Sequence, residues 1–132
     1  MKVLIVAEEL LIAMSLAAEL ELAGHQVLGP CASADEALRS LDGRHVDLAL
    51  IDAALHAPLS GSELATMLHA ECDIPTLLLT RDPAAAYTHV IGALGAITLP
   101  FDPADISASI EAAAVVLRGG KPISPPGSLQ LF

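Results

Sequence analysis

The chain has 132 residues, a length that fits one domain with one hydrophobic core. Apolar residues make up 54% and aromatic residues only 2%, so Ala, Leu, Ile and Val must fill the interior, which favours helices packed on a buried sheet over a β-sandwich. Sixteen acids against six Lys and Arg give a net charge of -10, and this excess, with so few rings for base stacking, excludes a nucleic-acid-binding protein.

The first part of the chain alternates predicted strands with predicted helices. Residues 3–6 are continuously apolar and mostly β-branched, which is typical of a strand covered on both faces. A helix is predicted over residues 9–23, and Gly24 follows it at the position where a left-handed residue commonly ends a helix. Residues 27–28, with an extension toward 31, form a second and weaker strand.

Two pairs of residues have the spacing of a capping box. Ser33 with Glu36, and Ser60 with Glu63, can each satisfy backbone amides that a helix leaves unpaired at its start. Helices are therefore predicted to begin at both serines, the first running to about residue 42.

Three more strands and two more helices complete the pattern. Residues 47–52 and 74–80 are apolar runs of strand length, and residues 96–98 form a short fifth strand. Each of two Asp-Pro pairs, at 82–83 and 102–103, combines a helix N-cap with a first-turn proline. Five strand-then-helix repeats predict an α/β fold with a doubly wound, five-stranded parallel sheet over residues 1–118.

Polar side chains follow three of these strands at the edge where such sheets bind ligands. Glu8 and Glu9 follow the first strand, Asp52 ends the third, and Thr80 ends the fourth. Clustered carboxylates suit Mg²⁺, and an aspartate beside that ion is a reasonable phosphoryl acceptor, with Asp52 the best candidate. Taken singly, Asp52 is equally explained by a turn, and the two glutamates by favourable interaction with a helix dipole.

Four segments together resemble the receiver domain of the two-component response regulators over residues 2–118: KVLIVAEELLIAMSL, DLALIDAAL, IPTLLLT and LPFDP. The resemblance implies the flavodoxin-like (βα)5 fold. It also implies that Asp52 accepts a phosphoryl group from a histidine kinase or a histidine phosphotransfer protein. In the family, Mg²⁺ is held by the residues matching Asp52, Glu8 and the backbone carbonyl of Ala54, with Glu9 a further candidate here. The hydroxyl at the position of Thr80 contacts the phosphoryl group.

The chain departs from the family pattern at four positions. Ala7 replaces one acid of the usual pair, and Glu8 is one methylene longer than the common Asp. Leu99, directly before Pro100, replaces the lysine that in the family pairs with the acyl phosphate. The family commonly has a cis peptide bond at this junction. Ala96 replaces the aromatic switch residue, so the usual coupling to Thr80 is absent.

Two hypotheses remain open. In the first, the chain is a stand-alone receiver that accepts a phosphoryl group on Asp52 and is no enzyme beyond, at most, self-dephosphorylation. In the second, it is a degenerate receiver that acts as an interaction module independent of phosphorylation. A flavin or nucleotide binder is a weaker third reading, because no glycine-rich phosphate loop follows the first strand.

Partner surfaces and surroundings are predicted from composition and from the resemblance. The first helix is apolar around its circumference, and the resemblance then predicts that it docks on the helical bundle of a kinase or phosphotransfer partner. A broad, leucine-rich core contact explains the same pattern equally well. A homodimer through the fourth helix, fifth strand and fifth helix is also expected, with contacts from Tyr87, His89 and Val90. His56, four residues after Asp52, can approach the phosphoryl group or respond to pH, although its loop position favours an ordinary exposed residue.

The ends of the chain complete the predictions. Only Lys2 precedes the first apolar stretch and acids follow at once, so neither a signal peptide nor a membrane segment is predicted, and a cytoplasmic protein is expected. Cys31 and Cys72 lack the spacing of a disulfide framework or zinc site. Residues 119–132, rich in Gly and Pro, are predicted to form a flexible tail.

Overall fold

The computed structural model describes residues 1–56, 59–82, 84 and 89–132. Its elements, in chain order, are β1 (Lys2–Val6), α1 (Leu10–Leu22), β2 (Gln26–Cys31), α2 (Ala34–Leu41), β3 (Leu48–Asp52), α3 (Gly61–Cys72), β4 (Thr76–Thr80), β5 (Ala93–Thr98), α4 (Pro103–Leu117) and β6 (Leu129–Leu131). The helix predicted to start at Asp82 falls largely on residues outside the described part of the chain. Within the described part, no helix is both long and apolar enough to cross a bilayer.

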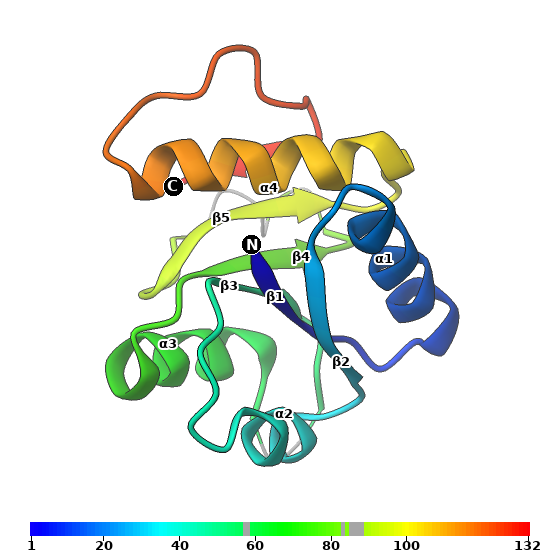
Figure 1. Cartoon of the computed structure of the whole chain (residues 1–132), viewed down its shortest axis with the longest axis vertical. Coiled ribbons are helices and arrows are strands. Elements are labelled where there is room, and N and C mark those ends of the chain that lie inside the picture. The colour runs from blue at the N-terminus through cyan, green and yellow to red at the C-terminus, as the bar shows by residue number, and fades with distance from the viewer. Residues whose placement is uncertain (57–58, 83, 85–88) are drawn as a thin grey trace.

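The sheet has the strand order β2-β1-β3-β4-β5-β6, and β1 to β5 are parallel. Figure 1 shows α4 and α1 on one side of the sheet and α2 and α3 on the other. The α/β doubly wound fold class is therefore confirmed. The chain order reverses direction between β1 and β3, so the carboxyl ends of these two strands define the crevice where ligands bind in such sheets.

Alternating side chains of the central strands build two cores. In β1, Val3 and Ile5 pack toward α1 and α4, whereas Leu4 and Val6 pack toward α2 and α3. All four are fully buried, because helices cover both faces of a parallel sheet and every strand position then becomes apolar. This packing holds the strand ends, and the polar residues that follow them, in fixed positions.

Local signals place the helices where the sequence predicted them. Ser60 and Glu63 form a complete capping box at the start of α3, with Ser60 Oγ accepting the Glu63 amide at 3.1 Å. Ser33 accepts the Glu36 amide, but the Glu36 carboxylate instead accepts the amide of Ala32, so this second box is incomplete. Gly24 has a φ of +91°, the left-handed conformation expected after α1.

The sheet has six strands, not five, and this corrects the predicted flexible tail. β6 pairs antiparallel with β5, with Leu129 opposite Ile97 and Leu131 opposite Gly95. The apolar residues of the terminal Leu-Gln-Leu segment pack on the body, and the Phe132 ring stacks on His89 with centroids 5.1 Å apart. Burial of these side chains and pairing of the exposed β5 edge outweigh the flexibility that the Gly and Pro content of residues 119–128 suggested.

The homodimer stays a prediction, and β6 adds one feature to the side of the sheet on which it was expected. The outer edge of β5 is already occupied by β6 over three paired positions. His89 contacts Phe132, and Val90 packs against the core, while Tyr87 lies outside the described residues. A partner that approaches this side of the described chain meets β6 rather than a free β5 edge.

Candidate functional site

Asp52 lies at the centre of the crevice because it ends β3, the strand between β1 and β4. Its carboxylate is half-buried, and Oδ1 accepts the backbone amide of Ala54 at 2.9 Å. No described residue donates a hydrogen bond to Oδ2. The short turn therefore fixes the direction of one carboxylate oxygen and leaves the other available to a ligand.

Helix α3 packs directly against this turn. A Cβ atom at Gly61, the first residue of α3, would lie 2.6 Å from Cα of Ala53 and would also collide with the carbonyl oxygen of Asp52. Only glycine allows so close an approach of two backbones. Gly61 thus lets the backbone of Ala53, the residue after Asp52, lie close against the start of α3.

Glu8 reaches across to the loop after β3. Its Oε1 accepts the backbone amide of His56 at 2.7 Å, and its Oε2 lies 2.7 Å from Nδ1 of the same residue. The backbone hydrogen bond from His56, with the contact to its ring, lowers the pKa of Glu8 below its ordinary value. The carboxylate is therefore anionic at neutral pH, and His56 lies beside the site rather than in an uninvolved loop position.

Glu9 forms an ion pair with Arg81, the residue that follows Thr80. The contact joins the segment after β1 to the segment after β4, which are 72 residues apart in the chain. Neither the composition nor the motif spacing predicted Arg81 as a site residue. The signal that could have predicted it is its position, directly after the threonine that ends β4.

Thr80 is buried at the end of β4, one residue beyond the position paired with Asp52. Its Oγ1 accepts the backbone amide of Asp82 at 3.1 Å, so the hydroxyl is held in a local turn. The carbonyl of Thr80 accepts the amide of Leu99 at 2.7 Å, which places residue 99 at the same edge. The Leu99-Pro100 bond is cis, as the family resemblance implied.

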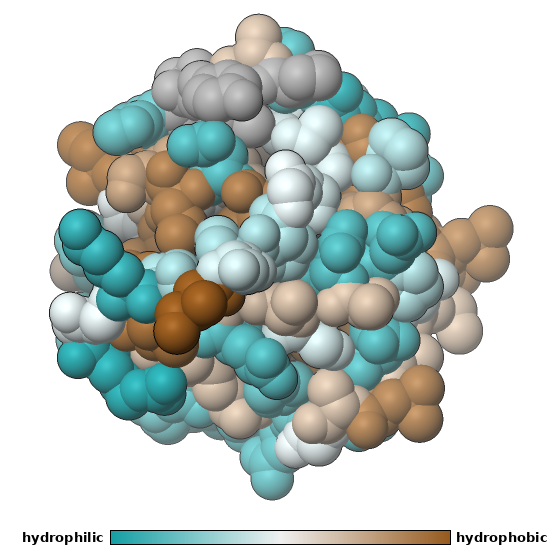
Figure 2. Space-filling view, turned by 90° about the horizontal axis from the view of Figure 1, so that it is seen from above, coloured by the Kyte–Doolittle hydropathy of each residue, from teal (hydrophilic) through white to brown (hydrophobic). Residues whose placement is uncertain are grey.

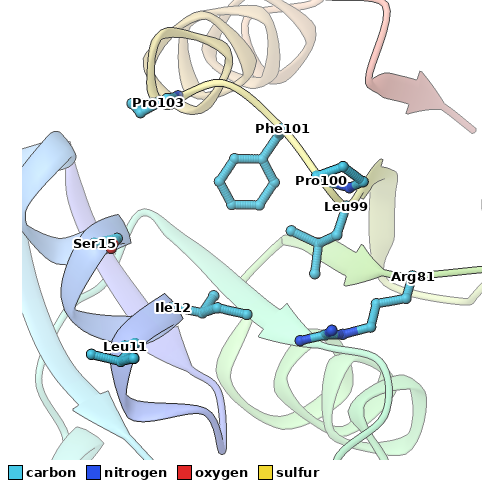
Figure 3. Close-up of a pocket in the computed structure, with 8 residues that line it drawn as sticks. All are labelled: Leu11, Ile12, Ser15, Arg81, Leu99, Pro100, Phe101 and Pro103. Carbon is cyan, nitrogen blue, oxygen red and sulfur yellow. The ribbon is translucent and has the colours of Figure 1, made fainter.

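An apolar groove opens at the ion pair of Glu9 and Arg81, between α1 and the segment that joins β5 to α4. Its volume is about 560 Å³, and Figure 3 shows the Arg81 guanidinium below Leu99, directed toward α1. The lining residues are Leu11, Ile12, Ser15, Arg81, Leu99, Pro100, Phe101 and Pro103. Apart from Arg81 and Ser15, the side chains of this groove are apolar.

The acidic residues differ in how well they fit Mg²⁺. Among the described residues, no group of three or more His, Cys, Asp and Glu lies close enough to hold a metal ion. Mg²⁺ commonly takes only one or two carboxylates and keeps several waters, so Glu8, Asp52 and the Ala54 carbonyl fit by donor chemistry. Glu9 is a poorer donor because Arg81 engages it, and His56 competes with a cation for Glu8.

Comparisons with known proteins agree with this arrangement. The response regulator receiver domain family matches residues 3–111 of the chain. The transcriptional regulatory protein YvrH of Bacillus subtilis is 32% identical over 113 residues, which is 83% of this chain and 47% of that protein. The chain thus spans about half the length of the curated relative that it matches.

Solved structures show the same fold. The signal receiver domain of a modulated diguanylate cyclase from Desulfovibrio desulfuricans is 30% identical, with a TM-score of 0.70 over 83% of this chain and 90% of that one. The N-terminal domain of a response regulator/sensory box/GGDEF protein from Carboxydothermus hydrogenoformans has a TM-score of 0.77 over 90% and 98% of the two chains. At 22% identity, the second likeness concerns the fold alone.

Proposed function

Because this chain belongs to the response regulator receiver domain family of two-component signalling, we propose that it accepts a phosphoryl group on Asp52. The observation that carries the proposal is the position of this carboxylate, which ends the central strand with Oδ1 held by Ala54 and Oδ2 free of described donors. In the proposed step, an Asp52 oxygen attacks the phosphorus of a phosphohistidine. The N–P bond breaks, the electron pair returns to the imidazole, and an acyl phosphate remains on Asp52.

The surrounding residues would each contribute to this step. Glu8, Asp52 and the Ala54 carbonyl would hold Mg²⁺, which when bound would supply positive charge to offset the negative charge of the acceptor and phosphoryl group. The Thr80 hydroxyl would donate to a phosphoryl oxygen in place of the Asp82 carbonyl, 3.4 Å away, while its Oγ1 could still accept the hydrogen bond from the Asp82 amide. The protein would act as an acceptor in a relay and, at most, hydrolyse its own acyl phosphate.

The donor is proposed to be a histidine kinase or a histidine phosphotransfer protein that docks on α1. Leu11 and Leu22 on this helix are 82% and 84% exposed, and the apolar groove borders it. Figure 2, seen from the α4 side, shows hydrophobic residues in separate patches between hydrophilic ones. A helical bundle with an apolar stripe would cover the exposed leucines of α1 while it presents its histidine to Asp52.

Phosphotransfer assays test the acceptor role. The wild type and the Asp52→Asn variant are incubated with a radiolabelled small-molecule phosphodonor and Mg²⁺, and the label is tested for stability in acid and lability in alkali. We expect an alkali-labile label on the wild type and none on D52N. Absence of an Asp52-dependent label would support the other candidate, a phosphorylation-independent interaction module, which the leucine at position 99 and alanine at position 96 favour.

A second experiment tests the docking surface. Leu11→Glu should weaken binding to members of a histidine-kinase panel without lowering the unfolding temperature, because the side chain is mostly outside the core. Ile123→Glu is a matched control, since Ile123 is 94% exposed and lies after α4. Equal binding by L11E and I123E would remove α1 as the docking surface.

A further inference from the structure

One positively charged side chain stands at the edge of the sheet where Asp52 lies. The chain has six Lys and Arg in total. Lys2 begins β1 at the opposite edge, and four others lie on or after helices: Arg39, Arg44, Arg118 and Lys121. Arg81 alone follows the carboxyl end of a strand of the crevice. At the position where the family resemblance implies a lysine, this chain has Leu99, so this edge has no lysine.

The ion pair of Arg81 crosses the end of β3. Arg81 extends from β4, and its partner Glu9 stands just before α1, after β1. The strand order places β3 between β1 and β4, so the side chains meet across the strand that Asp52 terminates. Figure 3 shows the guanidinium beneath Leu99, on the side that faces α1.

We infer that Arg81 supplies the positive charge that stabilises the phosphoryl group on Asp52, a role that Leu99 cannot perform. The inference rests on the proposed acceptor function. Arginine stays protonated at all relevant pH values, and its planar guanidinium binds phosphate oxygens through two parallel hydrogen bonds. Arg81 therefore has the charge and the planar donor group that the contact requires.

The present partner of Arg81 does not prevent this contact. The side chains of Arg81 and Glu9 are 62% and 56% exposed, and ion pairs with such exposure are weak because water screens them. A phosphoryl group carries about two negative charges at neutral pH, against one on Glu9, so it competes effectively for the guanidinium. Ile12, Leu99 and Phe101 line the same groove as Arg81 and offer the guanidinium no competing charged partner.

The experiment measures initial rates of Asp52 labelling by acetyl phosphate in the presence of Mg²⁺. In this step an Asp52 oxygen attacks phosphorus, the P–O bond to the acetyl group breaks, and acetate leaves with the electron pair. Arg81→Gln should lower the rate at least about tenfold, the usual effect of losing a charge-assisted hydrogen bond. Arg81→Lys should retain part of the rate. Arg44→Gln, which removes an exposed arginine at the opposite edge, should match the wild type.

Rescue separates a direct contact from a structural role. Adding Leu99→Lys to R81Q restores a cation at the position the family uses, so it should recover most of the lost rate. Unfolding curves from far-UV circular dichroism establish that each variant is folded. Equal rates for R81Q and the wild type, or a slow R81Q that L99K does not rescue, would overturn the assignment of Arg81 while the acceptor function stands. A wild type that takes no label refutes the acceptor function, and the inference with it.

Discussion

Replacing Gly61 with alanine should disturb the acceptor turn. The added Cβ would lie 2.6 Å from Cα of Ala53 and still closer to the carbonyl oxygen of Asp52, whereas ordinary contacts begin at 3.4 Å, so α3 or the end of β3 must move by at least about 0.8 Å. Both contacting groups are backbone, and neither can rotate away. Overpacking of this kind costs about 1 to 3 kcal/mol, and we expect a loss of about 2 kcal/mol in the free energy of unfolding.

The same displacement should slow phosphorylation, because Asp52 Oδ1 is oriented by the amide of Ala54 in the turn that moves. Urea unfolding followed by far-UV circular dichroism measures the stability, and the acetyl phosphate assay measures labelling of Asp52. Gly127→Ala is the matched control, since no atom lies within 4 Å of a Cβ built there. If G61A and G127A have the same stability and labelling rate as the wild type, Gly61 does not position the acceptor.

Three further changes test the edge strand, the metal ligands and the pH dependence. Gly95→Ala should detach β6, because the added Cβ would lie 3.1 Å from Cα of the paired Leu131 and would collide with the neighbouring backbone. Faster hydrogen exchange of the β6 amides would show the detachment, and unchanged exchange would contradict it. His56→Ala should raise Mg²⁺ affinity about two- to fivefold by calorimetry, since it removes a competitor for the Glu8 carboxylate worth up to about 1 kcal/mol. Asp47→Asn should lose about 1 kcal/mol of stability at pH 7, because the carboxylate accepts the amide that begins β1. That hydrogen bond lowers the pKa of Asp47 in the folded state, so the wild type should lose stability below about pH 4, and the variant should lose less over the same range.

Local signals in the sequence were sufficient to predict most of the fold. The apolar run before Asp52 and the spacing of Ser60 and Glu63 depend on residues that are neighbours in the chain, and the structure follows both. β6 was missed because its stability depends on the edge of β5, more than thirty residues away. The Gly and Pro content of residues 119–128 predicted a flexible tail, although the Leu-Gln-Leu alternation that follows is itself typical of a strand.

The candidate site divides in the same way. The positions of Glu8, Asp52 and Thr80 at one edge followed from the topology of parallel strands, which the sequence indicated. The contacts of His56 and Arg81 join residues 48 and 72 positions apart, and they depend on the paths of loops that no periodic pattern describes. Sequence reasoning could thus identify where the acids meet, but not which side chains lie against them.

The contacts of Glu8 and Glu9 reduce the repulsion that the excess of acids would otherwise create at the crevice. A net charge of -10 suggests a crevice that repels phosphoryl groups, yet two of its glutamates already have partners. Glu9 pairs with a permanent cation, and Glu8 accepts two hydrogen bonds from His56. The carboxylates of Asp52 and Glu9 each have one described partner, but only the partner of Glu9 is charged. The negative charge that an incoming phosphoryl group meets is therefore least compensated at Asp52, the group that must attack it. The Arg81 guanidinium at this edge would offset that repulsion more effectively than the same charge on a remote element, because Coulomb attraction falls with distance and salt screens charges that lie far apart.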